Sequence, residues 1–347
     1  MKHIHVIIPC YNVEKYLEEA VASVLDQPFK DLDIVLVDDG SPGKTPEICD
    51  MLAEKTPNIH VIHQTNAGVS AARNAGINYI LKKYANDLSG RYIAFLDADD
   101  GWEKDFLTPD TVTLLDGKYD LVGFQSRTCN AGMERKGAAT ALQTGAFAGN
   151  SMNVWLHSSQ HFGAMMYACG LLDQYSIRFQ NGLKYSEDKM FSLTCMYLAN
   201  RIWLENKVMY LYRIVVSSAM GTRKFGIPYY QPIIDGYLRM DREMERWENP
   251  SRGKLTAGRA CASHYTVCMM EEHFQNWRPK REVDRCLAEH PEYVDVMKRK
   301  PPYEYLPRNL RYEAYERNPK KFILKHNLLG IGEFIRRTIA RVWKYLN

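Results

Sequence analysis

The stretch YIAFLDADD, residues 92–100, is an apolar run of strand length that ends in three carboxylates, Asp97, Asp99 and Asp100. Three ionised carboxylates this close repel one another, and each loses solvation on burial, so the cluster needs a cation or solvent beside it. The simpler interpretation is a solvated acidic turn that opens a helix, where Asp is a favoured cap. The rest of the chain decides between the two.

Three similar apolar runs precede this stretch, at residues 3–9, 33–39 and 59–64. The segments between the runs have helical periodicity and lie at 14–27, 45–55 and 70–85. Buried-type strands that alternate with helices predict an α/β fold with a mostly parallel sheet flanked by helices on both faces. Ligands of such sheets bind beyond the carboxyl ends of the strands.

Polar residues follow each of the four predicted strands. Pro9, Tyr11 and Asn12 follow the first, Asp38 to Ser41 the second, Asn66 to Asn74 the third, and the Asp cluster the fourth. Because the carboxyl ends of parallel strands meet at one edge of a sheet, we expect these groups to converge. The convergence favours a binding site over a solvated turn.

The remainder of the chain divides into two further regions. We expect strands at 120–126 and 207–213, a helix at 185–199, and a change to helical sequence within 215–228. The predicted organisation is a catalytic domain over 1–217, a helical region over 218–330 for acceptor or oligomer contacts, and a basic amphipathic helix over 331–347.

The composition is that of a soluble globular protein, with 46% hydrophobic and 25% charged residues in 347 and a net charge of +4. No run approaches the roughly 20 apolar residues of a membrane span, and the first residues do not resemble a signal peptide, so we expect a cytoplasmic location. The eight cysteines form no C-x-x-C pair, which predicts buried thiols.

Asp97 and Asp99 have the chemistry of a Mg²⁺ or Mn²⁺ site. These hard cations take oxygen ligands, commonly one or two carboxylates together with water and the phosphate oxygens of a substrate. In an extended chain both side chains would point to the same side, while Asp100 would diverge or cap the next helix. A metal ion held by these carboxylates is expected to bind the phosphate oxygens of a diphosphate.

The same edge offers groups for a nucleotide. Asp38 and Asp39 are expected either to accept a hydrogen bond from a base or ribose or to stabilise a turn. Arg73 lies early in a helix, and it is expected either to reach a phosphate or to form a surface salt bridge.

A second acidic pair, Glu187 and Asp188, lies near the start of a predicted helix. Ser186 before it would serve as a helix cap if the pair has no chemical role. If the pair faces the metal site, one carboxylate would act as a general base towards an acceptor hydroxyl.

The motifs IIPCYN, VDDGS, EICD, NAGVSAARNAG, FLDADD and SEDKMF occur in an order and spacing that resembles the family 2 glycosyltransferases over residues 1–215. The resemblance implies a Rossmann-like GT-A fold and an inverting transfer of a sugar from a nucleotide sugar, most often a UDP-sugar, to a hydroxyl acceptor. It implies nucleotide-sugar contacts by Pro9, Tyr11, Asn12, Asp38, Asp39, Asn66, Arg73, Asp97 and Ala98. It also implies that Asp97 and Asp99 hold Mn²⁺ or Mg²⁺, and that Asp188 is the catalytic base with Glu187 beside it as the other candidate.

Three features fit this resemblance less closely. Gly43 and Lys44 stand where many members of the family have Asp and Asn, which should alter a loop more than the chemistry. A later stretch resembles one that borders the phosphates; it contains Tyr212, Arg213, Ser217 and Met220. His157 and His161 are candidates for a further metal ligand, although a lone His is more often structural.

The end of the chain is basic and amphipathic. From residue 317 onward there are eight Lys or Arg residues and one acid, and residues 332–347 carry an apolar stripe opposite the basic side chains. Such a helix either lies on an anionic membrane surface, here the inner face of the cell membrane, or packs on the protein or in a homodimer. Membrane contact would suit a lipid-linked glycan acceptor. A nucleic-acid partner is not expected, since it would leave the apolar stripe and the acidic edge unexplained.

Three other classes of protein are the alternatives. A sugar-phosphate nucleotidyltransferase typically has a Gly-rich loop after the first strand, and an NAD-dependent oxidoreductase has G-x-G-x-x-G there; neither pattern occurs in IPCYNVEKY. A non-catalytic subunit that binds a nucleotide sugar or assembles with a partner is disfavoured by the presence of Asp99 and Asp188.

Overall fold

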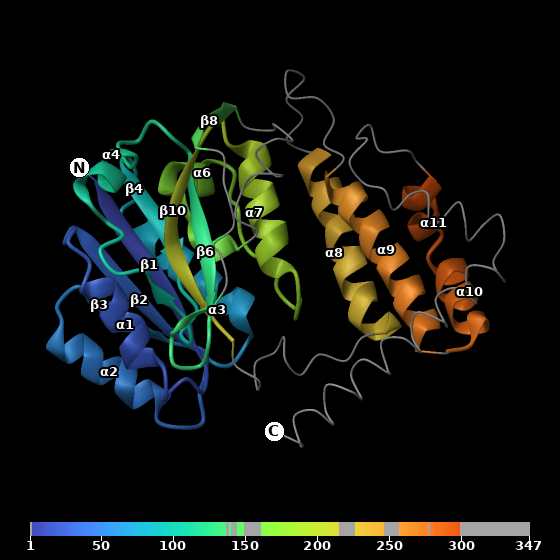
Figure 1. Cartoon of the computed structure of the whole chain (residues 1–347), viewed down its shortest axis with the longest axis horizontal. Coiled ribbons are helices and arrows are strands. Elements are labelled where there is room, and N and C mark those ends of the chain that lie inside the picture. Colours follow the sequence, from blue (N-terminus) through green and yellow to red (C-terminus); the bar gives the residue numbers. More distant parts are fainter. Residues whose placement is uncertain are drawn as a thin grey trace. The chain divides into compact units, whose positions relative to one another are not determined.

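The computed structural model describes residues 2–136, 139, 144–148, 161–214, 226–245, 257–276 and 278–298. The chain forms two compact units, residues 1–222 and 223–347, which are described separately here (Figure 1). The sequence-based proposals for His157, Ser217, Met220 and the amphipathic helix at 331–347 concern residues outside the described ranges.

A single large sheet forms the centre of the first unit. Its strands are β1 (His3–Cys10), β2 (Leu32–Asp38), β3 (Ile59–His63), β4 (Arg91–Phe95), β5 (Gly101–Trp102), β6 (Leu121–Cys129), β7 (Arg135–Lys136), β8 (Gly145–Ala148), β9 (Met165–Ala168) and β10 (Arg201–Arg213). The order across the sheet is β3-β2-β1-β4-β9-β6-β10-β5, with β7 paired to β6 and β8 to β10.

The sheet is parallel in one half and mixed in the other. Strand β1 pairs in parallel with β2 and β4, β2 with β3, and β6 with β10. The short strand β9 enters between β4 and β6 in the opposite direction. The expected α/β fold is confirmed, and its parallel part carries the four polar strand ends singled out in the sequence.

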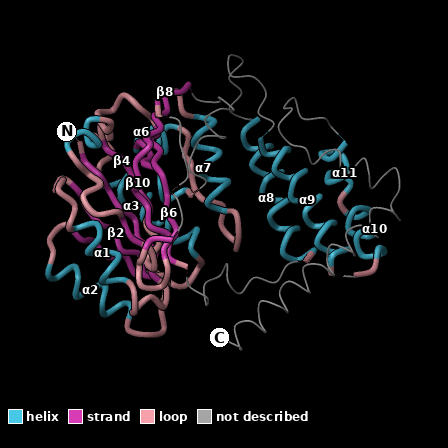
Figure 2. Tube along the Cα trace, in the orientation of Figure 1, coloured by secondary structure: helices cyan, strands magenta, loops and turns pink. Residues whose placement is uncertain are grey.

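Helices lie on both faces of this sheet (Figure 2). They are α1 (Leu17–Leu25), α2 (Thr45–Lys55), α3 (Val69–Lys83), α4 (Pro109–Thr113), α6 (Cys169–Gln174) and α7 (Glu187–Leu198), with a short 3₁₀ helix at Phe162–Ala164. Ile8 of β1 shares a buried cluster with Val21 of α1, whereas Ile7 lies against Gly76 of α3. Since adjacent residues of a strand point to opposite faces, α1 and α3 cover opposite sides.

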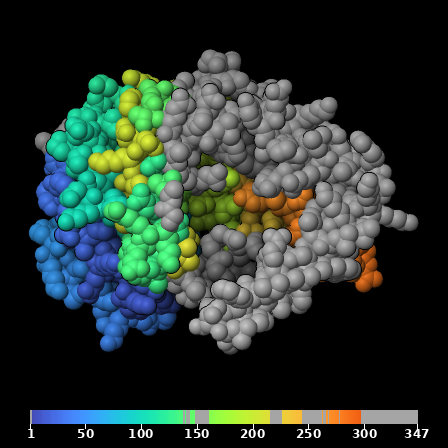
Figure 3. All heavy atoms as spheres, in the orientation of Figure 1, coloured from blue at the N-terminus to red at the C-terminus, as the bar shows by residue number. Residues whose placement is uncertain are grey.

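Segments that are far apart in sequence adjoin in the first unit. In the space-filling view, blue and teal segments from the N-terminal part of the chain lie beside green and yellow segments from beyond residue 120 (Figure 3). Phe95 at the end of β4 packs edge-on against Phe191 of α7, with ring centroids 5.5 Å apart. This packing brings the start of α7 close to the end of β4.

The second unit is helical in its described part. It contains α8 (Ile227–Glu245), α9 (Ala257–Gln275), α10 (Lys280–Glu289) and α11 (Pro291–Lys298). Tyr237 of α8 stacks on Tyr265 of α9 with ring centroids 5.5 Å apart, and Tyr293 of α11 donates a hydrogen bond to Asp235. In the described parts of both units, no helix combines the length and apolar character needed to cross a membrane.

Candidate functional site

The acidic residues after β4 lie in a turn rather than in an extended chain. The backbone N–H of Asp100 donates to the carbonyl of Asp97 at 2.9 Å, so the extended path expected for this stretch is wrong. Asp100 diverges from the other two acids, as one alternative predicted. Its buried carboxylate accepts hydrogen bonds from the Tyr210 hydroxyl (2.6 Å) and the Arg213 backbone N–H (2.7 Å). It caps no helix, because β5 follows directly.

Arg73 joins the end of β4 to the start of α7. Its Nη2 donates to Oδ1 of Asp97 at 2.7 Å, and its Nη1 donates to Oε1 of Glu187 at 3.0 Å. Only 3% of Arg73 is exposed, and its guanidinium lies over the rings of Phe162 and Phe179, so the alternative of a surface salt bridge is wrong. Burial alone would lower the pKa of Arg73, but Asp97 and Glu187 raise it above its ordinary value. Both terminal nitrogens are therefore committed to carboxylates.

The second acidic pair opens α7. Ser186 precedes the helix with φ of +64° and makes no side-chain cap hydrogen bond, so the predicted cap is wrong. A left-handed backbone at a non-glycine residue costs on the order of 1 kcal/mol, and such strain is concentrated at functional sites. Burial and the charge of Asp188 raise the pKa of Glu187 to about 7, against the opposing effect of Arg73.

Asp188 is the more accessible member of the pair. It is partly exposed, and its Oδ1 accepts the backbone N–H of Lys189 at 2.6 Å. Glu187, in contrast, is buried and held by Arg73. Asp188 is thus partly open to solvent, whereas Glu187 fixes the arginine that in turn fixes Asp97.

Asp97 and Asp99 fit a divalent cation chemically. Burial, and after it the charge of Asp97, raises the pKa of Asp99 to about 6. Within the described residues, no side chain hydrogen-bonds the carboxylate of Asp99. Asp97 uses Oδ1 to accept the hydrogen bond from Arg73, and its Oδ2 is not used in that bond. Incompletely neutralised carboxylate oxygens are the ligands that Mg²⁺ and Mn²⁺ prefer, and a bound cation would favour the charged form of Asp99.

His161 lies beside these acids. Its ring packs against Tyr210 with centroids 4.1 Å apart, and burial lowers its pKa despite the charges of Asp97 and Asp188. A neutral imidazole is the form that binds metals. A metal-ligand role for His161 remains a prediction.

Two loops, after β2 and after β3, form the part of the site at which the nucleoside is predicted to bind, and they hydrogen-bond to each other. Asp39 accepts the backbone N–H groups of Ala67 at 2.9 Å and Gly68 at 2.8 Å, one on each carboxylate oxygen. Asp38 accepts the Ser41 N–H at 3.1 Å. Gly40 has φ of +68°, and a Cβ there would lie 2.7 Å from the backbone nitrogen of Asn66. Asp39 therefore orders the loop that carries Asn66.

The end of β1 completes this part of the site. Tyr11 is 48% exposed, and the next residue, Asn12, donates its backbone N–H to Oγ of Ser41 at 3.2 Å. Pro9 is half-buried in β1, and Ala98 is buried within the acidic turn. An exposed, anchored aromatic ring suits stacking on a nucleobase.

Tyr210 is a part of the site that the sequence did not identify. Its hydroxyl accepts the Asp97 backbone N–H at 3.2 Å and donates to Asp100, so it holds both ends of the acidic turn. Arg213, which the family resemblance included, donates its Nε–H to the carbonyl of Asp99 at 2.7 Å. The role of Tyr210 could not be predicted from the sequence, because a tyrosine within an apolar strand pattern such as KVMYLYR usually belongs to the core.

Replacement of Tyr210 by Phe is expected to lower the free energy of unfolding by about 2–3 kcal/mol, since a buried carboxylate and a backbone N–H both lose a partner. Tyr92→Phe is the matched control, because the Tyr92 hydroxyl makes one bond, to the carbonyl of Tyr119 at 2.7 Å. That change should cost about 1 kcal/mol. Denaturant unfolding measures the free energy of unfolding of both variants. Equal losses of stability in the two would contradict the inference that Tyr210 holds both ends of the acidic turn.

Comparison with known proteins connects this site to a family. The sequence model of the family described as Glycosyl transferase family 2 matches residues 5–175. The chain is 29% identical over 247 residues to EpsJ of Bacillus subtilis, which is named an uncharacterized glycosyltransferase. It is 46% identical over 98 residues to the minor teichoic acid biosynthesis protein GgaB of the same species. The match covers 68% of this chain and 66% of EpsJ, and 27% of this chain and 10% of GgaB.

A solved structure has the same fold. The crystal structure of S. aureus TarS residues 1–349 in complex with UDP-GlcNAc superposes with a TM-score of 0.64 at 19% identity. The superposition covers 97% of this chain and 92% of that one. The chain thus spans most of the TarS fragment, but about two thirds or less of the curated relatives named above.

Proposed function

The chain belongs to glycosyltransferase family 2, and from this premise we propose that it transfers a sugar from a nucleotide sugar to a hydroxyl group of a glycan or lipid-linked acceptor. The observation that carries the proposal is the bridge made by Arg73. It links Asp97, the predicted metal ligand, to Glu187, which is adjacent to the predicted base. Because such buried pairs are costly to desolvate, the presence of one here supports a role for this edge in the chemistry.

We propose UDP as the nucleotide of the donor. The TarS structures were solved with UDP-GlcNAc and with UDP, and they share the fold of this chain. The exposed ring of Tyr11 would stack on the base. Asp38, whose two oxygens already face the Ser41 N–H and the His63 ring, would accept a further hydrogen bond from it. Asp39 would act indirectly, by holding the loop that carries Asn66.

We propose an inverting mechanism in which Asp188 is the general base. Its carboxylate takes the proton of the acceptor hydroxyl as that oxygen forms a bond to the anomeric carbon of the sugar. The bond from that carbon to the diphosphate breaks on the opposite side, and the electron pair leaves with the diphosphate. Asp97 and Asp99 would hold Mn²⁺ or Mg²⁺, which supplies charge stabilisation to the leaving diphosphate. Arg73 keeps Asp97 oriented throughout.

The acceptor is proposed to be a cell-surface polysaccharide or its lipid-linked precursor. Relatives of this chain include proteins named for teichoic and teichuronic acid biosynthesis. The basic amphipathic segment at 331–347 would place the enzyme at the inner face of the cell membrane, where lipid-linked acceptors are exposed to cytoplasmic enzymes. The alternative role for that segment is contact with a second copy of the chain.

The direct test is release of nucleoside diphosphate from a panel of nucleotide sugars in the presence of Mn²⁺. We expect one UDP-sugar to be turned over, slowly with water as acceptor and faster with the correct glycan, and release to stop when the metal is chelated. Tight binding of a UDP-sugar without release under any acceptor condition would instead support a non-catalytic subunit. Formation of a nucleotide sugar from a sugar phosphate and a nucleoside triphosphate would indicate a nucleotidyltransferase.

A further inference from the structure

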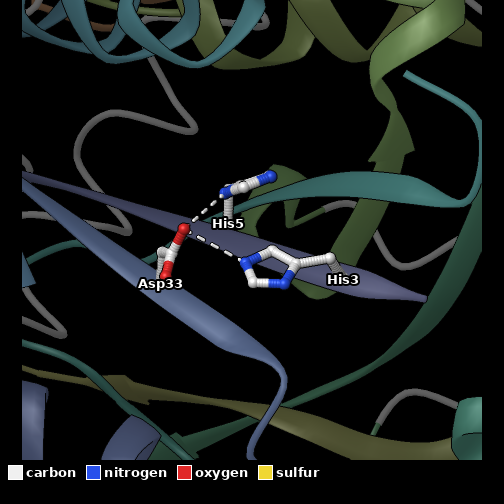
Figure 4. Close-up of side chains that lie close together, drawn as sticks. All are labelled: His3, His5 and Asp33. Carbon is white, nitrogen blue, oxygen red and sulfur yellow. Dashed lines mark ion pairs between the residues drawn. The ribbon is translucent and has the colours of Figure 1, made fainter. Parts of the chain in front are cut away.

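A second cluster of ligand-type side chains lies at the opposite end of the sheet from the acidic turn. His3 and His5 lie at the start of β1 and Asp33 at the start of β2, where the three side chains face one another (Figure 4). His3 and His5 are two residues apart on one strand and therefore share a face. Asp33 is the register partner of His5 on the neighbouring strand. The strand pairing alone thus places two imidazoles and a carboxylate together.

The spacing of the three groups suits one small cation. Nε2 of His3 lies 3.1 Å from Oδ2 of Asp33, and Nδ1 of His5 lies 3.5 Å from the same oxygen. Ligand atoms of all three residues lie within 4.8 Å of one another. A tetrahedral zinc ion with bonds of about 2.0–2.1 Å holds its ligand atoms roughly 3.3 Å apart. The two measured separations, 3.1 and 3.5 Å, bracket that value.

In the part of the chain that the structure describes, two of the imidazole nitrogens face one shared oxygen of Asp33 as ion pairs, and neither makes a well-aligned hydrogen bond to it. Only 1% of His5 is exposed, and neither of its ring nitrogens makes a hydrogen bond; Nε2 of His3 makes none either. Buried polar atoms without a partner are rare in folded proteins, and each costs about 1–3 kcal/mol. A bound cation between the three side chains would satisfy both histidines, which otherwise compete for a single oxygen of Asp33.

The carboxylate is already oriented by a supporting residue. Tyr84, which follows α3, donates its hydroxyl to Oδ2 of Asp33 at 2.9 Å. Such outer hydrogen bonds are usual around metal ligands. Two cations lie nearby and have partners of their own. Arg91 pairs with Asp87 at 3.0 Å, and the ammonium of Lys83 lies 3.0 Å from Nε2 of His60.

We propose that His3, His5 and Asp33 bind a transition-metal ion of the zinc class and thereby tie the start of β1 to the start of β2. Imidazole and carboxylate ligands together suit Zn²⁺ and Co²⁺, whereas the oxygen ligands of the acidic turn suit Mg²⁺ and Mn²⁺. The fourth position would be taken by water. This site is separate from sugar transfer, and its existence does not depend on the proposed enzymatic function.

The test is titration of the untagged chain with Zn²⁺ by calorimetry and with Co²⁺ by visible absorption. Asp99→Ala serves as the background, so that the acidic turn does not contribute. We expect one equivalent to bind and to raise the melting temperature. His3→Gln and Asp33→Asn should each weaken binding by at least about 100-fold and abolish that rise. His60→Gln is the matched control, since Nε2 of His60 lies 4.0 Å from the same Asp33 oxygen, and it should change affinity by no more than about threefold.

Three outcomes would overturn the proposal. One is failure of the parent chain to take up an equivalent of Co²⁺, which does not depend on the folding of any variant. Another is unchanged Zn²⁺ affinity in His3→Gln, a replacement of a partly exposed side chain. The last is an equal loss in His60→Gln, which would show that binding does not select the three proposed ligands.

Discussion

Replacement of Asp99 by Ala is expected to reduce sugar transfer by about 1,000-fold or more and to abolish the metal-dependent part of nucleotide binding. The reason is that no side chain among the described residues hydrogen-bonds the half-buried carboxylate of Asp99, which is the proposed metal ligand. Loss of the proposed ligand would release the metal and remove its charge stabilisation from the leaving diphosphate. The measurements are UDP release and calorimetric binding of UDP with and without Mn²⁺.

The matched control for Asp99→Ala is Asp26→Ala, which removes an exposed carboxylate after α1. Asp26→Ala should leave both turnover and Mn²⁺-dependent binding unchanged. If Asp99→Ala retained wild-type binding of UDP in the presence of Mn²⁺, Asp99 would not be a metal ligand. The Asp99→Ala chain should remain folded, because the turn around it is held by Tyr210 and Arg213.

Replacement of Asp188 by Ala is expected to reduce the turnover number by about 10²–10⁴-fold while nucleotide affinity stays within about twofold. General-base catalysis contributes roughly this factor, and it acts on the acceptor rather than on the donor. Asp188 is partly exposed at the first turn of α7, as the proposed base must be to meet an acceptor. Steady-state kinetics with the acceptor, together with UDP calorimetry, separates the loss of chemistry from a loss of binding.

Asp173→Ala is the control for this second change, because Asp173 is an exposed acid at the end of α6. It should retain full activity. Normal turnover by Asp188→Ala would remove Asp188 as the base and assign that role to Glu187, whose pKa of about 7 also suits proton transfer. Loss of UDP binding in Asp188→Ala, on the other hand, would indicate a structural role at the helix start.

The sequence by itself determined the fold class and the edge of the sheet at which the site lies. Strand-length apolar runs that alternate with helical periods define a sheet flanked by helices, and the polar residues after each run define its ligand-binding edge. These signals are local, because a few consecutive residues are enough to show the apolar character and the period of a strand or helix. The same local signal places Tyr11, Asp38 and Asp99 at one edge before any contact is known.

The tertiary structure alone decided how those residues are held. The contact between Arg73 and Glu187 joins positions 114 residues apart, and Tyr210 reaches Asp97 across a separation of 113. The cluster at His3, His5 and Asp33 likewise depends on the pairing register of two strands. No local pattern encodes such contacts, since their free energy comes from desolvation and pairing of groups that meet only when the sheet and α7 have packed.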